Sequence, residues 1–200
     1  MTMNEPYTLD VKRRGFGDAL LYFAAALCLL LLAVTIINSV FSLCLVAGSS
    51  RWPTLRDGQY VTLYNSFTPE CGDIVVFDCE EGTLIKRVVA TEGQTVELRY
   101  AGDNVLELYV DGERTEEDYL GEPMKDAYLR HSGVFLRPDE IVTVPEGCLF
   151  VLGDNRNDST DSRFASVGFV PIGSVRGKVA AIVPPGNITE FFVRLFMGGL

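Results

Sequence analysis

The stretch ALLYFAAALCLLLLAVTIINSVF, residues 19–41, decides how this chain is organised. It lies inside a longer segment, from Asp18 to Arg51, whose interior contains no charged residue. As an α-helix, about 23 residues would extend roughly 35 Å, enough to cross the ~30 Å hydrocarbon core of a bilayer with some tilt. The apolar part of a typical signal peptide is only about 7–15 residues long. The sequence therefore predicts one uncleaved transmembrane anchor.

A cleaved signal peptide is the alternative interpretation of the same stretch. Val46 and Gly48 are small residues at the third and first positions before Ser49, the spacing that a signal-peptide cleavage site requires. Cleavage there would release a secreted β-domain whose mature N-terminus lies near Ser49.

The charges on the two sides of the span predict its orientation. Lys12, Arg13 and Arg14 precede the span, whereas no basic residue follows it until Arg51. Because basic residues stay on the cytosolic side, residues 1–18 are expected to form a cytosolic tail. Residues 19–41 then form the anchor, and the rest of the chain lies outside.

Composition excludes several classes of protein. The chain has 200 residues, of which 48% are hydrophobic and 22% charged, so it is expected to fold rather than remain disordered. A net charge of −10 without a basic stripe argues against a nucleic-acid partner. The five cysteines include no C-x-x-C pair and no partner histidines at zinc spacing, so neither a metal nor another cofactor is expected.

Beyond the anchor the pattern is typical of a β protein. Short alternating or apolar runs such as QYVTLY, DIVVFD, TVELRY and CLFVLG are separated by turn signals such as RDG, AGDN and PEG. We expect a mostly β, antiparallel domain at residues 42–186, with a smaller β insertion at about 95–145. The closing residues 187–200 form an apolar tail that is too short to cross a membrane.

Three polar segments could carry chemistry, and the first is GSSRWPTLRDG, residues 48–58. Pro53 restricts Trp52 to an extended backbone, so Ser49 and Ser50 are expected in a tight turn before an extended segment. This segment also fits a plain linker with solvated serines, in which Trp52 and Arg51 anchor the chain at the membrane interface.

The second segment is TLIKRVVA, residues 83–90. In a strand, side chains alternate between faces, so Lys86 shares one face with Leu84 and Val88. Burial among apolar neighbours lowers a lysine pKa, because the charged amine loses its hydration, and a neutral amine can act as a base. The alternative is an edge-strand lysine that deters aggregation.

The third segment is the polar run GDNRNDSTDSR, residues 153–163, which follows an apolar strand. It could be a solvated turn with side-chain caps. A calcium loop does not fit, since Arg156 stands where that motif has an oxygen ligand. Asp161 and Arg163 lie on the same side of an extended chain and could pair. A serine, a lysine of lowered pKa and orienting hydroxyls are the parts of a Ser–Lys hydrolase site.

Taken together, these segments resemble the bacterial type I signal peptidases, which are membrane-bound Ser–Lys proteases. GSSRWPTL is similar to the nucleophile segment of that family, GDIVVF to its core strand and IKRVVATEGQ to its lysine segment. GDNRNDSTDSR followed by GFVPIGSVRGKV is the most specific match. The resemblance extends from the anchor to about Pro185.

The resemblance implies roles for individual residues. Ser50 would be the nucleophile and Lys86 the general base, and the backbone N–H of Ser50 would donate to the oxyanion. The supporting residues would come from the 153–163 segment: Ser159, which would orient Lys86, the pair Asp161 and Arg163, and Gly153, Asp154 and Asn155.

The sequence departs from the family at the position after the nucleophile. The family has Met there, and this chain has Arg51. Either Arg51 extends to lipid phosphate and activity survives, or the site is altered. Gly48 stands where some relatives have an extra serine, which leaves the second oxyanion donor unnamed.

The resemblance also implies partners and a location. Preprotein signal peptides with small residues at positions −1 and −3 would be the substrates, bound as extended strands at a sheet edge. The lipid bilayer and the secretion machinery would be further partners, and the chain would span the bacterial plasma membrane once, with its catalytic domain on the extracytoplasmic side. A non-catalytic relative that acts in assembly of surface proteins is the alternative. A self-cleaving repressor is disfavoured, because a membrane span occupies the place of its DNA-binding part.

Overall fold

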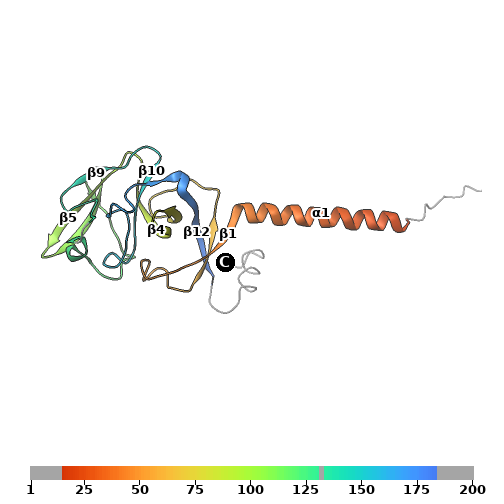
Figure 1. Ribbon diagram of the computed structural model, residues 1–200, viewed down its shortest axis with the longest axis horizontal. Helices are drawn as coiled ribbons and strands as arrows, with labels where there is room; N and C mark the ends of the chain where they lie inside the picture. Colours follow the sequence, from red (N-terminus) through yellow and green to blue (C-terminus); the bar gives the residue numbers. More distant parts are fainter. Residues whose placement is uncertain (1–14, 131–132, 184–200) are drawn as a thin grey trace, which may run out of the picture. The chain divides into compact units, whose positions relative to one another are not determined.

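The computed structural model describes residues 15–130 and 133–183, and the chain divides near Ser39 into a helix and a β domain (Figure 1). The helix, α1, spans Phe16–Val40. Its segment Gly17–Ile37 has a mean hydropathy of 2.8 and none of it is buried, so it is long and apolar enough to cross a membrane. The helix covers the predicted span 19–41 except for Phe41, which begins a strand.

The β domain is built from strands joined mostly by tight turns, as the turn signals indicated. In chain order they are β1 (Phe41–Leu45), β2 (Tyr60–Tyr64), β3 (Ile74–Cys79), β4 (Gly82–Thr91), β5 (Thr95–Gly102), β6 (Val105–Val110), β7 (Glu113–Arg114), β8 (Met124–Lys125), β9 (Ile141–Thr143), β10 (Cys148–Leu152), β11 (Val170–Pro171) and β12 (Val175–Val183). Two short 3-10 helices, Asp126–Arg130 and Ile172–Ser174, complete the described part.

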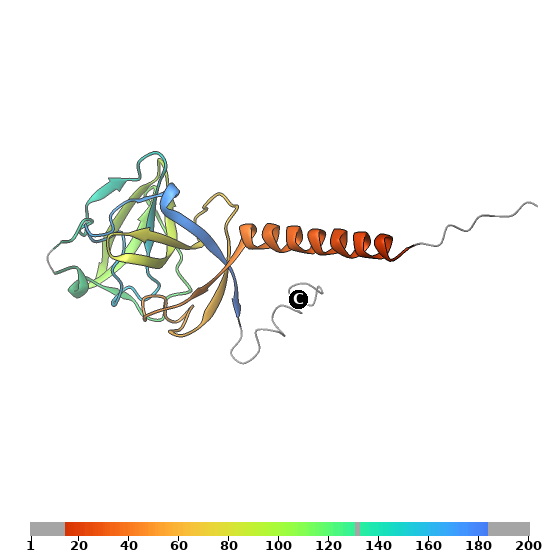
Figure 2. The ribbon, with the colours of Figure 1, turned by 45° about the vertical axis from the view of Figure 1, so that its right-hand side comes forward.

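The larger sheet carries the segments singled out from the sequence. Its order is β1-β2-β12-β3-β4-β10-β11, and every pairing is antiparallel. Within it, β4 lies between β3 and β10, with Lys86 opposite Val75 and Arg87 opposite Leu152. Figure 2 shows β12 crossing the domain beside the other strands of this sheet. A central strand buries side chains on both faces, and for this reason Lys86 in β4 is shielded from solvent.

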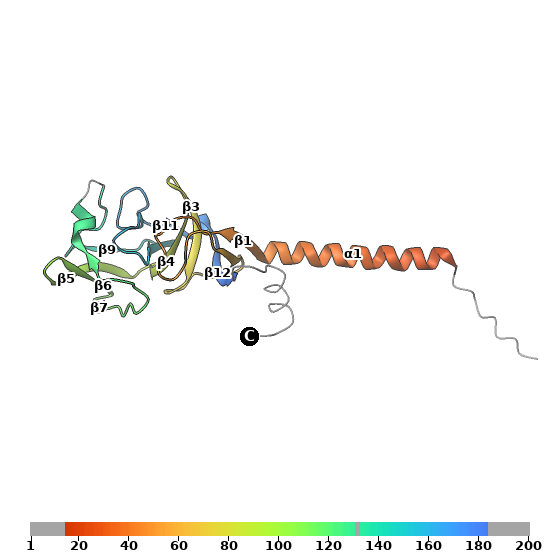
Figure 3. The same cartoon turned by 90° about the horizontal axis from the view of Figure 1, so that it is seen from below.

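The smaller sheet is the predicted insertion. Its order is β7-β6-β5-β9, with β8 also paired to β6. Seen from below, β5, β6 and β7 occupy the end of the domain opposite β1 and β12 (Figure 3). The antiparallel, mostly β fold with one N-terminal apolar helix is therefore confirmed.

Three clusters of buried apolar side chains stabilise the β domain. Most of their members come from strands, in which alternate side chains point toward the core. One, which includes Val96, Leu98 and Phe150, joins the insertion to the main sheet. A second surrounds Val75 and Val88, and a third joins strand residues of β2 and β3 to Leu55 of the 48–58 segment. The predicted apolar tail at 187–200 and the basic residues 12–14 lie outside the described residues.

Candidate active site

Ser50 lies in a turn between β1 and β2 that is held by backbone hydrogen bonds and by the burial of Leu55. The backbone N–H of Trp52 donates to Ser49 O at 2.9 Å, and that of Leu55 donates to Arg51 O at 2.9 Å. Leu55 is fully buried in the third apolar cluster. The turn is therefore tethered to the core on one side, while Ser50 itself is half-buried and Ser49 exposed.

The 153–163 segment, which follows β10, holds the other side of this turn. Asn155 N–H donates to Ser50 O at 3.1 Å, and its side-chain amide donates to Ser49 O at 3.3 Å. The Ser49 hydroxyl donates to Asp158 Oδ2 at 2.6 Å. These contacts bring together two of the three predicted segments, and they involve backbone atoms on either side of the predicted nucleophile. Such contacts fix the position of Ser50 without using its hydroxyl.

Lys86 brings the third segment into the same region. Its side chain is 2% exposed, because β3 and β10 flank its strand. Burial lowers the pKa of Lys86 to about 8, since a charged amine there has lost its hydration; the Asp161 carboxylate opposes this effect, and the charges of Arg51 and Arg163 add to it. The sequence-based expectation of a dry lysine of lowered pKa agrees with this geometry.

Asp161 and Arg163 form a buried ion pair beside this lysine. Arg163 Nε donates to Asp161 Oδ1 and Nη2 to Oδ2, each at 2.8 Å, and both side chains are fully buried. Asp161 Oδ2 also accepts from Gly153 N–H at 2.9 Å. Burial alone would raise the pKa of Asp161, but the guanidinium charge and these hydrogen bonds hold it below its ordinary value. Asp161 is therefore an anion that orders the loop.

Gly153 marks the closest approach between the segments. A Cβ at this position would lie 2.0 Å from Ser159 Oγ and 2.7 Å from Ser50 O. The Ser159 hydroxyl is buried and has no hydrogen-bond partner among the described residues. The structure thus places Ser159 at the turn of Ser50, and its proposed orienting contact with Lys86 is not formed here.

This close approach gives a first testable prediction. We expect Gly153→Ala to lower the free energy of unfolding by about 3 kcal/mol, since its Cβ can be accommodated only by moving Ser159 and backbone of the Ser50 turn. The matched control is Gly173→Ala, where an added Cβ meets nothing within 4 Å. Thermal unfolding of the two variants compares them directly, and equal midpoints would contradict the packing described here.

The position of Arg51 differs from the sequence-based expectation. The prediction that Arg51 extends to lipid phosphate is wrong: its side chain is 1% exposed and turns into the protein. Nη1 donates to Asp154 Oδ1 at 2.7 Å and to Leu152 O at 3.4 Å. The carboxylate of Asp154 and the carbonyl of Leu152 therefore replace water at Nη1. Trp52, the next residue, remains 46% exposed.

Several charged residues around the Ser50 turn form ion pairs that the sequence does not predict. Arg87 binds Asp154 through both Nε and Nη2 at 3.0 Å, and its guanidinium lies 4.0 Å from the centre of the Tyr119 ring. Arg156 pairs with Glu117, which also accepts a hydrogen bond from Tyr119. Glu117 and Tyr119 come from the insertion, and no local pattern in the sequence pointed to them.

The predicted nucleophile and base are connected through neighbours rather than directly. Among the described residues, no hydrogen bond links Ser50 Oγ to Lys86 Nζ, and none uses the backbone N–H of Ser50. The link between the segments runs from Arg87, the residue after Lys86, through Asp154 to Arg51, the residue after Ser50. An amine of lowered pKa and a half-buried hydroxyl fit acyl transfer by a serine.

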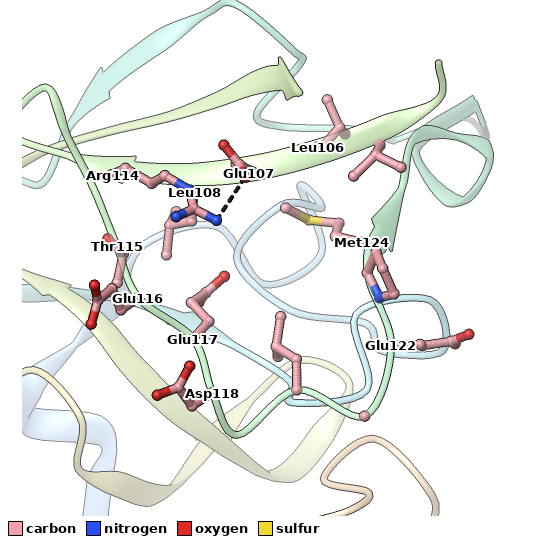
Figure 4. Close-up of a pocket in the computed structure, with 14 residues that line it drawn as sticks. Leu106, Glu107, Leu108, Arg114, Thr115, Glu116, Glu117, Asp118, Glu122 and Met124 are labelled. Atoms are coloured by element: carbon pink, nitrogen blue, oxygen red, sulfur yellow. Dashed lines mark ion pairs between the residues drawn. The ribbon is translucent and has the colours of Figure 1, made fainter. Parts of the chain in front are cut away.

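A separate cavity of about 720 Å³ lies in the insertion, lined by β6 and the 114–124 segment. Figure 4 shows its acidic side chains, among them Glu116, Glu117 and Asp118, and the ion pair of Arg114 with Glu107. None of the predicted site residues lines it. In residues 15–130 and 133–183, no three His, Cys, Asp or Glu side chains are grouped as metal ligands.

Known proteins with similar sequences indicate the family of this chain. The profile of the family described as signal peptidase, peptidase S26, matches residues 20–184. A signal peptidase I of Bacillus licheniformis is 40% identical over 139 residues, covering 66% of this chain and 71% of the relative. Signal peptidase I T of Bacillus subtilis is 39% identical over 140 residues, covering 66% of this chain and 69% of the relative.

A solved structure of a signal peptidase I from Enterococcus faecalis is 34% identical and covers 57% of this chain and 98% of that one, with a TM-score of 0.42. The family profile spans far more than half of the chain, and the resemblance noted in the sequence is thereby confirmed. This chain belongs to the signal peptidase family, peptidase S26.

Proposed function

We propose that this signal peptidase cleaves signal peptides from preproteins with Ser50 as its nucleophile and Lys86 as its general base. The observation that carries the proposal is the burial of Lys86, whose side chain is 2% exposed and whose pKa is lowered to about 8. At pH 7 about a tenth of such an amine is neutral, whereas an ordinary lysine is almost entirely protonated. A neutral amine can accept the proton of a serine hydroxyl.

The reaction follows from these two groups. Lys86 Nζ takes the Ser50 Oγ proton while Oγ forms a bond to the scissile carbonyl carbon, and the Ser50 N–H donates to the resulting oxyanion. The C–N bond then breaks, and Lys86 gives the proton to the leaving amine of the mature protein. Water next attacks the Ser50 ester with Lys86 as base, which releases the signal peptide and restores the hydroxyl.

The other predicted residues support this pair. Asn155 fixes the Ser50 turn through Ser50 O, and Asp154 joins that turn to β4. Asp161 and Arg163 form the buried ion pair of the loop that carries Ser159, whose hydroxyl would orient the Lys86 amine. Gly153 permits the close approach of these parts. None of these groups needs to exchange a proton during the reaction.

The topology of the chain completes the proposal. The basic residues 12–14 place the N-terminus in the cytosol by the positive-inside rule, so the β domain is extracytoplasmic. Ser50 follows the predicted span by about nine residues, a short tether that keeps the nucleophile close to the outer surface of the membrane. Substrates have small residues at positions −1 and −3, and the secretion machinery delivers them to this surface.

The pH dependence of cleavage tests the proposal. The full chain in detergent micelles is incubated with a preprotein whose signal peptide ends in Ala-x-Ala, and the new N-terminus is identified by mass spectrometry. Because protonated Lys86 cannot act as a base, kcat/KM is expected to fall about tenfold per pH unit below about pH 8 and to level off above it.

Two results would contradict this expectation. The fall of kcat/KM toward low pH is the acid limb of the profile. If cleavage showed no acid limb between about pH 6 and about pH 10, no amine of this pKa would be the base. No cleavage at any pH, by a chain that unfolds cooperatively, would favour the non-catalytic assembly module.

A further inference from the structure

Arg51 is a buried charged side chain for which the reaction above has no role. Its guanidinium is 1% exposed, and only Nη1 has partners, at Asp154 and Leu152 O. Nε and Nη2 are buried without any hydrogen-bond partner among the described residues. Burying a charge with unmet donors costs several kcal/mol, so a residue of this kind calls for a compensating function.

The charges around Arg51 do not balance. Arg87 already binds both oxygens of Asp154, so one carboxylate faces two guanidinium groups. The other buried arginines have partners of their own, since Arg163 pairs with Asp161 and Arg156 with Glu117. Burial lowers the pKa of Arg51 to about 10, with Asp154 opposing the effect, so the side chain stays charged near neutral pH. The cluster of Arg51, Arg87 and Asp154 therefore holds an excess positive charge.

This excess charge acts on Lys86. The groups that affect the charge of Lys86 from the surrounding elements are Asp161 and Arg163 in the loop after β10, Arg51 in the Ser50 turn, and Cys79 at the end of β3. Asp161 and Cys79 favour the protonated amine, whereas Arg51 and Arg163 favour the neutral one. Arg163 has the carboxylate of Asp161 to itself, whereas Arg51 shares that of Asp154 with Arg87, so the positive charge of Arg51 is only partly neutralised.

We propose that Arg51 is a positioning residue of this peptidase, which ties the Ser50 turn to Asp154 and sets an unbalanced positive charge beside Lys86. The proposal rests on the roles given above to Ser50 and Lys86. It assigns a function to the arginine that stands in place of the family Met: the residue after the nucleophile also favours the neutral form of the base. A purely structural arginine would hold the turn and leave the pH dependence of cleavage unchanged.

Two substitutions separate the charge from the hydrogen bond. Arg51→Gln keeps an N–H donor for Asp154 but removes the charge, and Arg51→Lys keeps both a donor and a charge. We expect the acid limb of kcat/KM for Arg51→Gln to move to higher pH by about one unit, so that cleavage at pH 7 falls about tenfold. For Arg51→Lys, the acid limb of kcat/KM is expected at the same pH as for the unsubstituted chain.

Arg176→Met is the matched control, because Arg176 also pairs with an aspartate, Asp78, but at an exposed site. It is expected to leave both the limb and the plateau unchanged. If Arg51→Gln does not fold, Arg51→Met removes the same charge with an unbranched side chain and gives the same comparison.

An acid limb at the same pH in the neutral variant and the unsubstituted chain would overturn the role of Arg51. That result leaves the functions of Ser50 and Lys86 intact. Their failure would instead appear as the absence of a limb in the unsubstituted chain, so the two proposals fail in distinguishable ways.

Discussion

Ser50→Ala is expected to abolish cleavage of a preprotein, with a loss on the order of 10⁴-fold or more in kcat/KM. The hydroxyl is the group that forms the covalent bond, and alanine offers no atom in its place. The fold should not change, because the contacts of the Ser50 turn use the backbone oxygen of Ser50 and not its hydroxyl. Mass spectrometry of the processed preprotein measures the loss, and the thermal unfolding midpoint checks the fold.

Ser49→Ala is the matched control for this prediction. Ser49 is the neighbouring serine, but its hydroxyl is already used in a hydrogen bond to Asp158 at 2.6 Å. Losing that bond loosens the turn, so we expect a decrease of no more than about tenfold. If instead Ser49→Ala abolished cleavage and Ser50→Ala did not, the nucleophile would be Ser49 and the assignment to Ser50 would be wrong.

The fold was largely predictable because its rules are local. A charge-free run of helical length predicted α1, and alternation with turn residues predicted the strands of both sheets and the insertion. The same alternation indicated that Lys86 would share a face with apolar side chains, and its burial agrees with this. The helix ends one residue before the predicted span does, since Phe41 is as apolar as the helix but pairs with Tyr64 of β2.

The charged network could not be predicted, because its partners are far apart in the chain. Arg51 meets Asp154 across a separation of 103 residues, and Arg156 meets Glu117 across 39. Seen locally, an arginine beside an exposed tryptophan and close to a membrane span is typical of an interfacial anchor, and that reading was wrong for Arg51. Only the antiparallel pairing of β4 with β10 brings Asp154 beside both Arg87 and the Ser50 turn.

Lys86→Met is expected to be as inactive as Ser50→Ala while making the protein more stable. Methionine has an unbranched side chain that fits the same space but cannot accept a proton, so cleavage is lost. Lys86→Arg is expected to be inactive as well, because a guanidinium stays protonated. The two variants separate the need for a neutral base from the need for a long side chain.

The gain in stability follows from the pKa of Lys86, which falls from 10.5 to about 8 on folding. Between these values the unfolded chain binds more protons than the folded one, so stability rises with pH across this window. Below about pH 8 the folded protein therefore carries the full penalty of about 3 kcal/mol, which Lys86→Met removes.

Thermal unfolding of the full chain in detergent micelles measures this penalty. The variant should have the higher midpoint at pH 7, and its advantage should shrink as the pH rises from about 8 to about 10.5. This prediction depends on the burial of the amine. If the midpoint at pH 7 were unchanged by Lys86→Met, the lysine would be solvated in the folded protein. A solvated lysine would be almost fully protonated at that pH and could not act as the base for Ser50.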